Sequence, residues 1–306
     1  MSTAVEVTGV QRTYGSTTAL AGVSTTVREG TICGLLGRNG AGKTTLLSLV
    51  AGQERPSSGT VRTLGHDPVE SVEVLSRTSF VRDSQRWPDD FRIAHVLSVA
   101  PAFHAGWDAG LARDLVADLR VPTRTPIKKM SRGQASSVAI VLGLASRAPL
   151  TIFDEPYLGL DATARQIFYD RLLADYAEHP RTVLLSTHLV DESESLLEQV
   201  VVLDEGRVVL DADVDTARDS AWTAAGAAGA VDRVVGSRRV LARHALGGLA
   251  SVTVDGAPDE AVRREARAAG VELGSVSLQQ LVAALGAGEP TVDAGAPATA
   301  TEGALS

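Results

Sequence analysis

The stretch GRNGAGKT at residues 37–44 limits the possible folds of this chain more than any other part of the sequence. It has the pattern G-x-x-x-x-G-K-[ST], and it lies between the apolar run TICGLL and the helical pattern KTTLLSLVA. Glycines let the backbone approach a phosphate closely, Lys43 supplies a cation, and the hydroxyl of Thr44 can bind Mg²⁺. A glycine-rich turn without a ligand is the alternative interpretation. The complete motif between a strand and a helix favours a P-loop that binds a nucleoside triphosphate.

Strand and helix patterns alternate along the first 210 residues. Apolar or alternating runs predict strands within residues 1–36 and at 60–65, 78–81, 150–153, 182–186 and 200–210, the last of these forming a hairpin. Helical patterns cover 43–51 and most of 89–146. This alternation predicts an α/β fold whose sheet is mostly parallel at its centre.

The stretch LTIFDEP at 150–156 places two carboxylates at the end of a predicted buried strand. Asp154 can hold Mg²⁺ through water, as the second acidic motif of P-loop proteins does. Glu155 can accept a proton from an attacking water. Two adjacent acidic residues usually belong to a solvated loop, but after a buried strand in a P-loop chain they indicate a hydrolytic centre.

Composition and charge exclude several classes of protein. A net charge of −8 and a pI of about 5.3 argue against binding to nucleic acid through a basic face, so we expect no nucleic-acid partner. The single cysteine, Cys33, excludes an internal disulfide and indicates a reducing compartment. The start MSTAVEVTGV lacks a signal-peptide pattern, and no apolar run approaches the roughly 20 residues of a membrane-spanning helix. These features predict a cytoplasmic protein.

Four more short motifs follow the P-loop in a fixed order. They are MSRGQ at 130–134, FDEP at 153–156, GLD at 159–161 and STH at 186–188. The serine and glycine of MSRGQ open a predicted helix, and the unpaired N–H groups at such an end attract an anion. The whole arrangement, over about residues 5–210, resembles the ATP-binding subunits of ABC transporters.

This resemblance implies a fold, an activity and a second protein chain. The fold is an α/β P-loop ATPase core with an antiparallel β subdomain near the N-terminus and a helical subdomain at about residues 84–145. The activity is hydrolysis of ATP with Mg²⁺. Two such domains meet head to tail in this family, so that MSRGQ of one chain contacts the γ-phosphate held by the P-loop of the other.

The resemblance also assigns roles to individual residues. Glu155 and His188 are the catalytic residues, and His188 contacts the γ-phosphate. The metal is assigned to Thr44 and Asp154. The residues assigned to ATP are Tyr14, which stacks on adenine, the P-loop residues Gly37, Arg38, Asn39, Gly40, Ala41, Gly42, Lys43, Thr44 and Thr45, and Ser131, Gly133, Gln134 and Asp161, which face the other chain's nucleotide.

Several positions depart from the family pattern, beginning with Met130, which replaces leucine in a tolerable apolar exchange. Arg132 replaces a glycine that is often substituted in bacterial relatives, and Tyr157 stands where threonine or serine is common. The glutamine that usually reaches Mg²⁺ is not found at its expected place, which falls on Asp83, while Gln85 follows two residues later. We therefore expect a further metal ligand here, and we favour Asp83 over Gln85. The alternative is that both are solvated loop residues and that water takes the place at the metal. We read no function into Tyr157.

Five aromatic residues are concentrated in the segment that begins the predicted helical subdomain. They are Phe80, Trp87, Phe91, Phe103 and Trp107. In the family this segment forms the groove that receives a cytoplasmic helix of the membrane subunit. We expect most of these rings to form a small helical core and one or two of them to line the groove.

The composition changes after residue 211. We expect an ATPase domain at 1–211, a small α+β appendage at 212–286 and a disordered tail at 287–306. Within the appendage, AWTAAGAAGA at 221–230 consists almost entirely of small residues, which predicts a linker or a poorly packed segment.

The predicted function is ATP hydrolysis that powers a separate integral membrane permease, as in bacterial exporters. The expected partners are a second copy or a homologous ATPase subunit and the permease, which would hold the protein on the inner face of the membrane. Ribosome-associated relatives carry two nucleotide domains, and DNA-repair relatives insert a long coiled coil, whereas here 87 residues separate Lys43 from Ser131. A nucleotide sensor without catalysis is the third alternative, and the presence of Glu155 argues against it.

Overall fold

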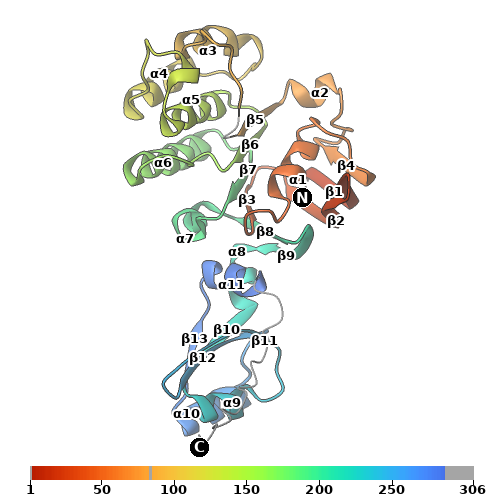
Figure 1. Cartoon of the computed structure of the whole chain (residues 1–306), viewed down its shortest axis with the longest axis vertical. Coiled ribbons are helices and arrows are strands. Elements are labelled where there is room, and N and C mark those ends of the chain that lie inside the picture. Colours follow the sequence, from red (N-terminus) through yellow and green to blue (C-terminus); the bar gives the residue numbers. More distant parts are fainter. Residues whose placement is uncertain (1, 83–84, 287–306) are drawn as a thin grey trace, which may run out of the picture. The chain divides into compact units, whose positions relative to one another are not determined.

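The computed structural model describes residues 2–82 and 85–286, and these fall into two compact units (Figure 1). The first unit contains the described residues up to Ser220 together with Val276–Gly286, and the second contains Ala221–Ser275. The boundary therefore lies after Ser220 rather than after residue 211, and the chain returns to the first unit at its last helix. The predicted tail at 287–306 lies outside the described residues.

A six-stranded sheet forms the centre of the first unit, in the order β5-β6-β7-β3-β8-β9. All neighbouring strands are parallel except β8 and β9, which form the predicted antiparallel hairpin. Every residue of β3, β6 and β7 is buried, as expected for parallel strands covered on both faces. The strands are β3 (Ile32–Leu36), β5 (Thr78–Arg82), β6 (Leu150–Asp154), β7 (Thr182–Thr187), β8 (Gln199–Asp204) and β9 (Arg207–Asp213).

A three-stranded antiparallel sheet and helix α1 cover one face of the central sheet (Figure 1). The elements are β1 (Thr3–Tyr14), β2 (Thr17–Arg28), β4 (Ser58–Thr63) and α1 (Lys43–Val50). Their apolar side chains, such as Leu20 and Leu47, share one core with Ile152 and Val201 of the central sheet. The P-loop ATPase fold with an N-terminal antiparallel subdomain is confirmed.

Helices α5 and α6 lie on the other side of the central sheet (Figure 1). The helices of this region are α2 (Val72–Leu75), α3 (Ile93–Val99), α4 (Ala109–Asp118), α5 (Arg132–Ala145) and α6 (Ala162–Glu178). Aliphatic residues such as Ile93, Leu115 and Ile140 are buried here. The prediction that most of the five clustered aromatic residues form this core is wrong, because none of them is fully buried. Leucine and isoleucine fill the interior, so the rings remain at its surface.

Three short helices complete the first unit: α7 (Val190–Ser193), α8 (Val214–Asp219) and α11 (Leu278–Leu285). Helix α11 packs against α7 and α8. It therefore belongs to the ATPase unit, although in sequence it follows the second unit. Among the described residues, no helix is both long enough and apolar enough to cross a membrane.

The second unit has the order β-α-β-β-α-β, with a four-stranded antiparallel sheet in the order β11-β12-β10-β13. This is a ferredoxin-like arrangement. Its elements are β10 (Ala221–Ala227), α9 (Ala228–Val235), β11 (Val240–Leu246), β12 (Leu249–Asp255), α10 (Glu260–Ala269) and β13 (Glu272–Ser275).

The prediction of a linker at 221–230 is wrong. Most of this segment is β10, a central strand that pairs with both β12 and β13, and the rest starts α9. Trp222 and Ala224 are buried in a separate apolar core with Val231 and Val252. Small residues have a low strand propensity in isolation, but pairing on both sides and burial of Trp222 override it.

Candidate active site

The loop between β3 and α1 has glycines at positions where other residues do not fit. Gly37 has a φ of 143°, and a Cβ there would lie 2.2 Å from the carbonyl oxygen of Leu203. Gly42 has a φ of 104°, and its Cβ would lie 2.7 Å from the oxygen of Ala19. The loop therefore ends at the start of α1 in a tight turn, where free N–H groups and the helix dipole favour a phosphate.

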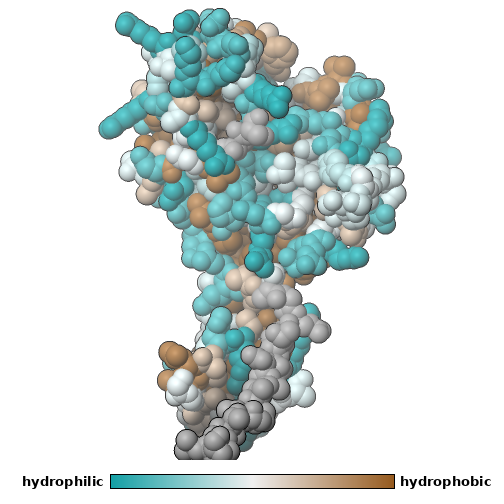
Figure 2. Space-filling view, in the orientation of Figure 1, coloured by the Kyte–Doolittle hydropathy of each residue, from teal (hydrophilic) through white to brown (hydrophobic). Residues whose placement is uncertain are grey.

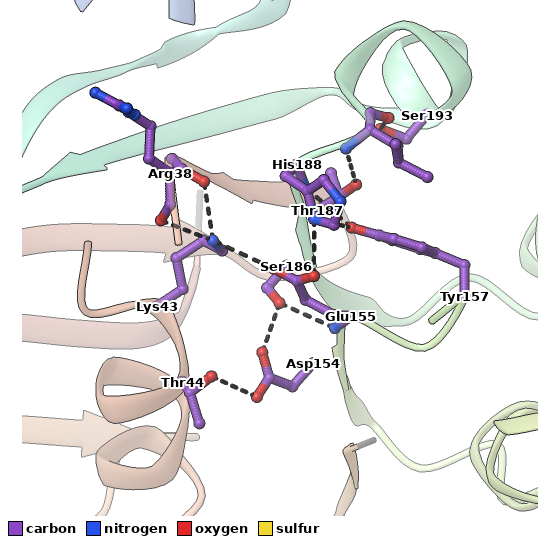
Figure 3. A network of polar contacts seen from close by, with 12 residues as sticks. Arg38, Lys43, Thr44, Asp154, Glu155, Tyr157, Ser186, Thr187, His188 and Ser193 are labelled. Carbon is purple, nitrogen blue, oxygen red and sulfur yellow. Dashed lines mark hydrogen bonds and ion pairs between the residues drawn. The ribbon is translucent and has the colours of Figure 1, made fainter. Parts of the chain in front are cut away.

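Lys43 is the first residue of α1, and its side chain is only 5% exposed. Its ammonium donates to the carbonyl oxygens of Gly37, at 2.8 Å, and of Arg38, at 3.2 Å (Figure 3). It also lies 3.3 Å from Oε1 of Glu155. The predicted phosphate-binding cation and the predicted general base are thus neighbours, although 111 positions separate them in the sequence.

Asp154, at the end of β6, accepts hydrogen bonds from two hydroxyl groups. Thr44 donates to Oδ2 at 2.8 Å, and Ser186 of β7 donates to Oδ1 at 2.6 Å (Figure 3). The structure therefore joins the two predicted Mg²⁺ ligands, Thr44 and Asp154. A hydroxyl and a carboxylate are oxygen donors of the kind that Mg²⁺ binds. Within the described part of the chain, no group of three or more His, Cys, Asp or Glu side chains is arranged to hold a metal ion.

Glu155 has a left-handed backbone, with a φ of 49°. Such a conformation is unusual outside glycine and requires support from its surroundings. Its N–H donates to the side-chain and main-chain oxygens of Ser186, at 3.0 and 3.3 Å. Its Oε2 lies 2.8 Å from Nδ1 of His188, which follows β7. The strained turn aims Glu155 at both Lys43 and His188.

These groups line a single pocket of about 610 Å³. Among the residues predicted from the sequence, its lining includes Asn39, Gly40, Gly42, Lys43, Thr44, Thr45, Asp154, Glu155 and His188. Arg132 also lines it. Two other residues of the P-loop have contacts elsewhere. Ala41 is buried in the core beside the loop. Arg38 donates a hydrogen bond to the carbonyl oxygen of Gly286 at 3.3 Å. The pocket thus combines a phosphate cradle, oxygen ligands and a carboxylate–imidazole pair.

Tyr14 lies at the end of β1, and 42% of it is exposed. The guanidinium carbon of Arg12 lies 4.5 Å from the centre of its ring. Glu54 accepts a hydrogen bond from the Tyr14 hydroxyl and forms an ion pair of 2.8 Å with Arg12. One face of the ring is thus covered by a cation, and the hydroxyl is fixed.

The residues of the MSRGQ motif lie at the start of helix α5. Ser131 and Gln134 cap it reciprocally, with Ser131 Oγ accepting from N–H of Gln134 and Gln134 Oε1 accepting from N–H of Ser131. A Cβ on Gly133 would lie 2.2 Å from the oxygen of Gly159, so a glycine is needed there. Asp161 caps α6 by accepting from N–H of Ala164 at 2.8 Å.

The two candidates for the further metal ligand have different outcomes. Asp83 lies outside the described residues. Gln85 lines an apolar groove of about 620 Å³ rather than the phosphate pocket.

The groove is also lined by four of the five clustered aromatic residues, namely Phe80, Trp87, Phe91 and Phe103. Hydrophobic surface gathers over α2 and beside α3, both of which border this groove (Figure 2).

Tyr157 is a functional candidate that sequence reasoning missed. It is only 2% exposed, and its hydroxyl contacts His188 through both the main chain and the imidazole. Burial raises the pKa of its phenol, so the hydroxyl keeps its proton at neutral pH. The only signal in the sequence was the departure from the family pattern at this position.

The fold and the pocket define a P-loop ATPase with an added α-helical region. The family model described as ABC transporter matches residues 20–158. The chain is 34% identical over 258 residues to the aliphatic sulfonates import ATP-binding protein SsuB 1 of Burkholderia lata, covering 84% of this chain and 77% of that protein. It therefore belongs to the ATP-binding proteins of ABC transporters, a family of ATPases that bind ATP.

A second relative and a solved structure agree with this family, and the two relatives differ in their named transport direction. The Nod factor export ATP-binding protein I of Ralstonia nicotianae is 31% identical over 212 residues, which cover 67% of this chain and 65% of that protein. A solved structure described as an ATP binding subunit of an ABC transporter superposes with a TM-score of 0.62 at 26% identity, covering 70% of this chain and 91% of that one. Proteins named for import and for export are thus both similar to this chain.

Proposed function

We propose that this protein hydrolyses ATP with Mg²⁺ and that the energy drives a separate membrane permease. The observation that carries the proposal is the contact of Glu155 with both Lys43 and His188 in the pocket formed by the P-loop. A phosphate-binding cation, a general base and an imidazole are the groups that phosphoryl transfer to water requires.

Each side chain has a distinct part in the reaction. The P-loop N–H groups and Lys43 bind and orient the β- and γ-phosphates, and they balance the charge that develops on the γ-phosphate. Glu155 accepts a proton from the attacking water, and His188 contacts the γ-phosphate oxygen. Thr44 and Asp154 would hold Mg²⁺, which supplies positive charge against the phosphates when it is bound.

The experiment that tests the hydrolytic site separates binding from chemistry. Glu155→Gln keeps the size of the side chain but cannot accept a proton, so we expect kcat to fall about 100-fold or more with ATP binding retained. Lys43→Ala removes a charged donor, so we expect weaker ATP binding as well as loss of turnover. The exposed Glu178→Gln serves as the matched control and should behave like the original protein. Near-normal turnover of Glu155→Gln would overturn the proposal.

The proposal includes a second copy of the chain or a homologous subunit as partner. Ser131, Gly133 and Gln134 form the exposed or half-exposed first turn of α5, where N–H groups favour an anion. This first turn is suited to the γ-phosphate of another chain's ATP. Asp161, exposed at the start of α6, would lie in the same interface.

The permease would dock on the apolar groove between α2, β5 and α3. Phe103 is 67% exposed there, and Val72, Leu75 and Val99 are exposed as well. Such a cluster of exposed apolar and aromatic side chains marks an interaction surface. Docking there would hold the protein on the inner face of the membrane. The proposal includes no nucleic-acid partner.

For the direction of transport we propose export, and the similarity to a Nod factor export protein supports this direction. Cells that produce the protein with its permease should accumulate less of the cargo than cells with the Glu155→Gln variant. Higher accumulation would instead identify an importer.

A further inference from the structure

Tyr157 is joined to His188 by three contacts. The Tyr157 hydroxyl accepts a hydrogen bond from the backbone N–H of His188 at 2.9 Å, and it lies 3.2 Å from Nδ1 of the imidazole (Figure 3). The two rings are perpendicular neighbours, with centroids 5.6 Å apart and an interplanar angle of 64°. The phenol thus fixes both the main chain and the side chain of His188.

The proton on Nδ1 of His188 is constrained by its two neighbours. Nδ1 lies 2.8 Å from Oε2 of Glu155, and when Nδ1 carries a proton it donates to this carboxylate, which only accepts hydrogen bonds. The Tyr157 hydroxyl can either accept or donate, so it tolerates this state and also the state in which Nδ1 has lost its proton. Tyr157 can therefore pair with the imidazole in either protonation state of Nδ1.

Another buried tyrosine lacks such partners. Tyr169 in α6 is also buried, and its hydroxyl has no hydrogen-bond partner within the described parts of the chain. Its ring packs against Phe168. Burial of a tyrosine in this fold therefore does not by itself bring a contact with the active site, and the placement of Tyr157 is specific.

We propose that Tyr157 is a positioning residue that holds the imidazole of His188 against Glu155, and that it thereby sets the rate of hydrolysis. This inference rests on the proposed roles of Glu155 and His188. Tyr157 lines no part of the phosphate pocket itself, because the described lining of that pocket includes His188 but not Tyr157. The contacts with His188 are the route by which we propose that Tyr157 acts on the site.

The kinetic test is a double-mutant cycle in the whole protein. Tyr157→Phe keeps the ring and removes the hydroxyl, so we expect kcat to fall about 3- to 10-fold, with KM for ATP unchanged. In a His188→Ala background the same substitution should change kcat by less than 2-fold. Tyr169→Phe is the matched control and should leave kcat unchanged. An unchanged kcat in Tyr157→Phe, or an equal loss in both backgrounds, would overturn the inference.

A spectroscopic readout keeps the inference testable if His188→Ala has no measurable turnover. The ¹⁵N signals of the His188 side chain report which ring nitrogen carries the proton and how it is hydrogen-bonded. Tyr157→Phe should shift these signals, and Tyr169→Phe should not. Unchanged His188 signals would refute the role of Tyr157 while leaving the proposed function intact. Normal turnover of His188→Ala would instead refute the proposed role of His188.

Discussion

Two side chains around Tyr14 hold the ring that we propose to bind adenine. Arg12 covers one face of the ring, and Glu54 holds both Arg12 and the Tyr14 hydroxyl. The hydrogen bond with Tyr14 raises the pKa of Arg12, so the guanidinium keeps its positive charge. In the proposed nucleotide complex, adenine would stack on the opposite face of the ring, whose hydroxyl is fixed by Glu54.

This arrangement predicts how two substitutions affect nucleotide affinity. Tyr14→Ala should weaken ATP binding about 5-fold or more, since one stacked base contributes about 1–3 kcal/mol. Arg12→Gln should weaken it about 2- to 5-fold by loosening the ring. Inorganic triphosphate lacks a base, so its dissociation constant should not change in either variant. A matching loss of triphosphate affinity would show that Tyr14 acts on the phosphates or on folding instead.

At the scale of elements, helix α11 links the end of the described chain to two parts of the active site. Its apolar residues, Leu278, Leu281, Val282 and Ala284, are buried. Its Gln279 accepts a hydrogen bond from N–H of Asp191, in the helix that follows His188. The oxygen of Gly286, directly after α11, accepts from Arg38 of the P-loop. Loss of α11 should therefore disturb both His188 and the P-loop.

The N-cap of α11 offers a mild test of this link. Ser277 accepts from N–H of Gln280 at 3.1 Å, so Ser277→Ala should destabilise the helix by about 1 kcal/mol and lower kcat a few-fold. Asp259→Ala removes the same kind of cap from α10 in the second unit and should leave kcat unchanged. Thermal unfolding and ATPase assays on both variants decide the matter. Equal kcat values would show that α11 only contributes stability.

At the scale of the whole molecule, the proposed second copy makes a prediction about mixed subunits. Ser131→Arg blocks one surface, and Lys43→Ala disables the P-loop, so each variant alone should be inactive. A mixed dimer contains one site in which the P-loop and the first turn of α5 are both intact. Each mixed dimer should therefore recover up to about half of the activity of the original dimer, because one of its two sites is intact. Mixing Lys43→Ala with the Lys43→Ala/Ser131→Arg double variant is the control and should restore none.

An absence of rescue in the first mixture, with mixed dimers shown to form, would argue against catalysis across two chains. It would leave the geometry of Lys43, Glu155 and His188 within one chain unaffected. The two results therefore test the dimer and the hydrolytic site separately.

The sequence alone determined the features whose physics is local. The P-loop needs glycines at set spacings and a lysine at the start of a helix, so GRNGAGKT predicted the loop, its strand and its helix correctly. The hairpin of β8 and β9 likewise depends on its own turn, and the family motifs identified the fold. Asp154 and Glu155 were singled out because they end an apolar strand.

Tertiary structure decided the features that depend on which strands are neighbours. Strands β6 and β7 are parallel and paired in register, so the residues after both strands meet at one edge of the sheet. Tyr157 reaches His188 for this reason, across 31 positions of sequence. The alanine-rich β10 is a central strand because β12 and β13 pair with it, and the clustered aromatic rings line a groove because aliphatic residues fill the core. Pairing and burial involve distant residues, and no local pattern encodes them.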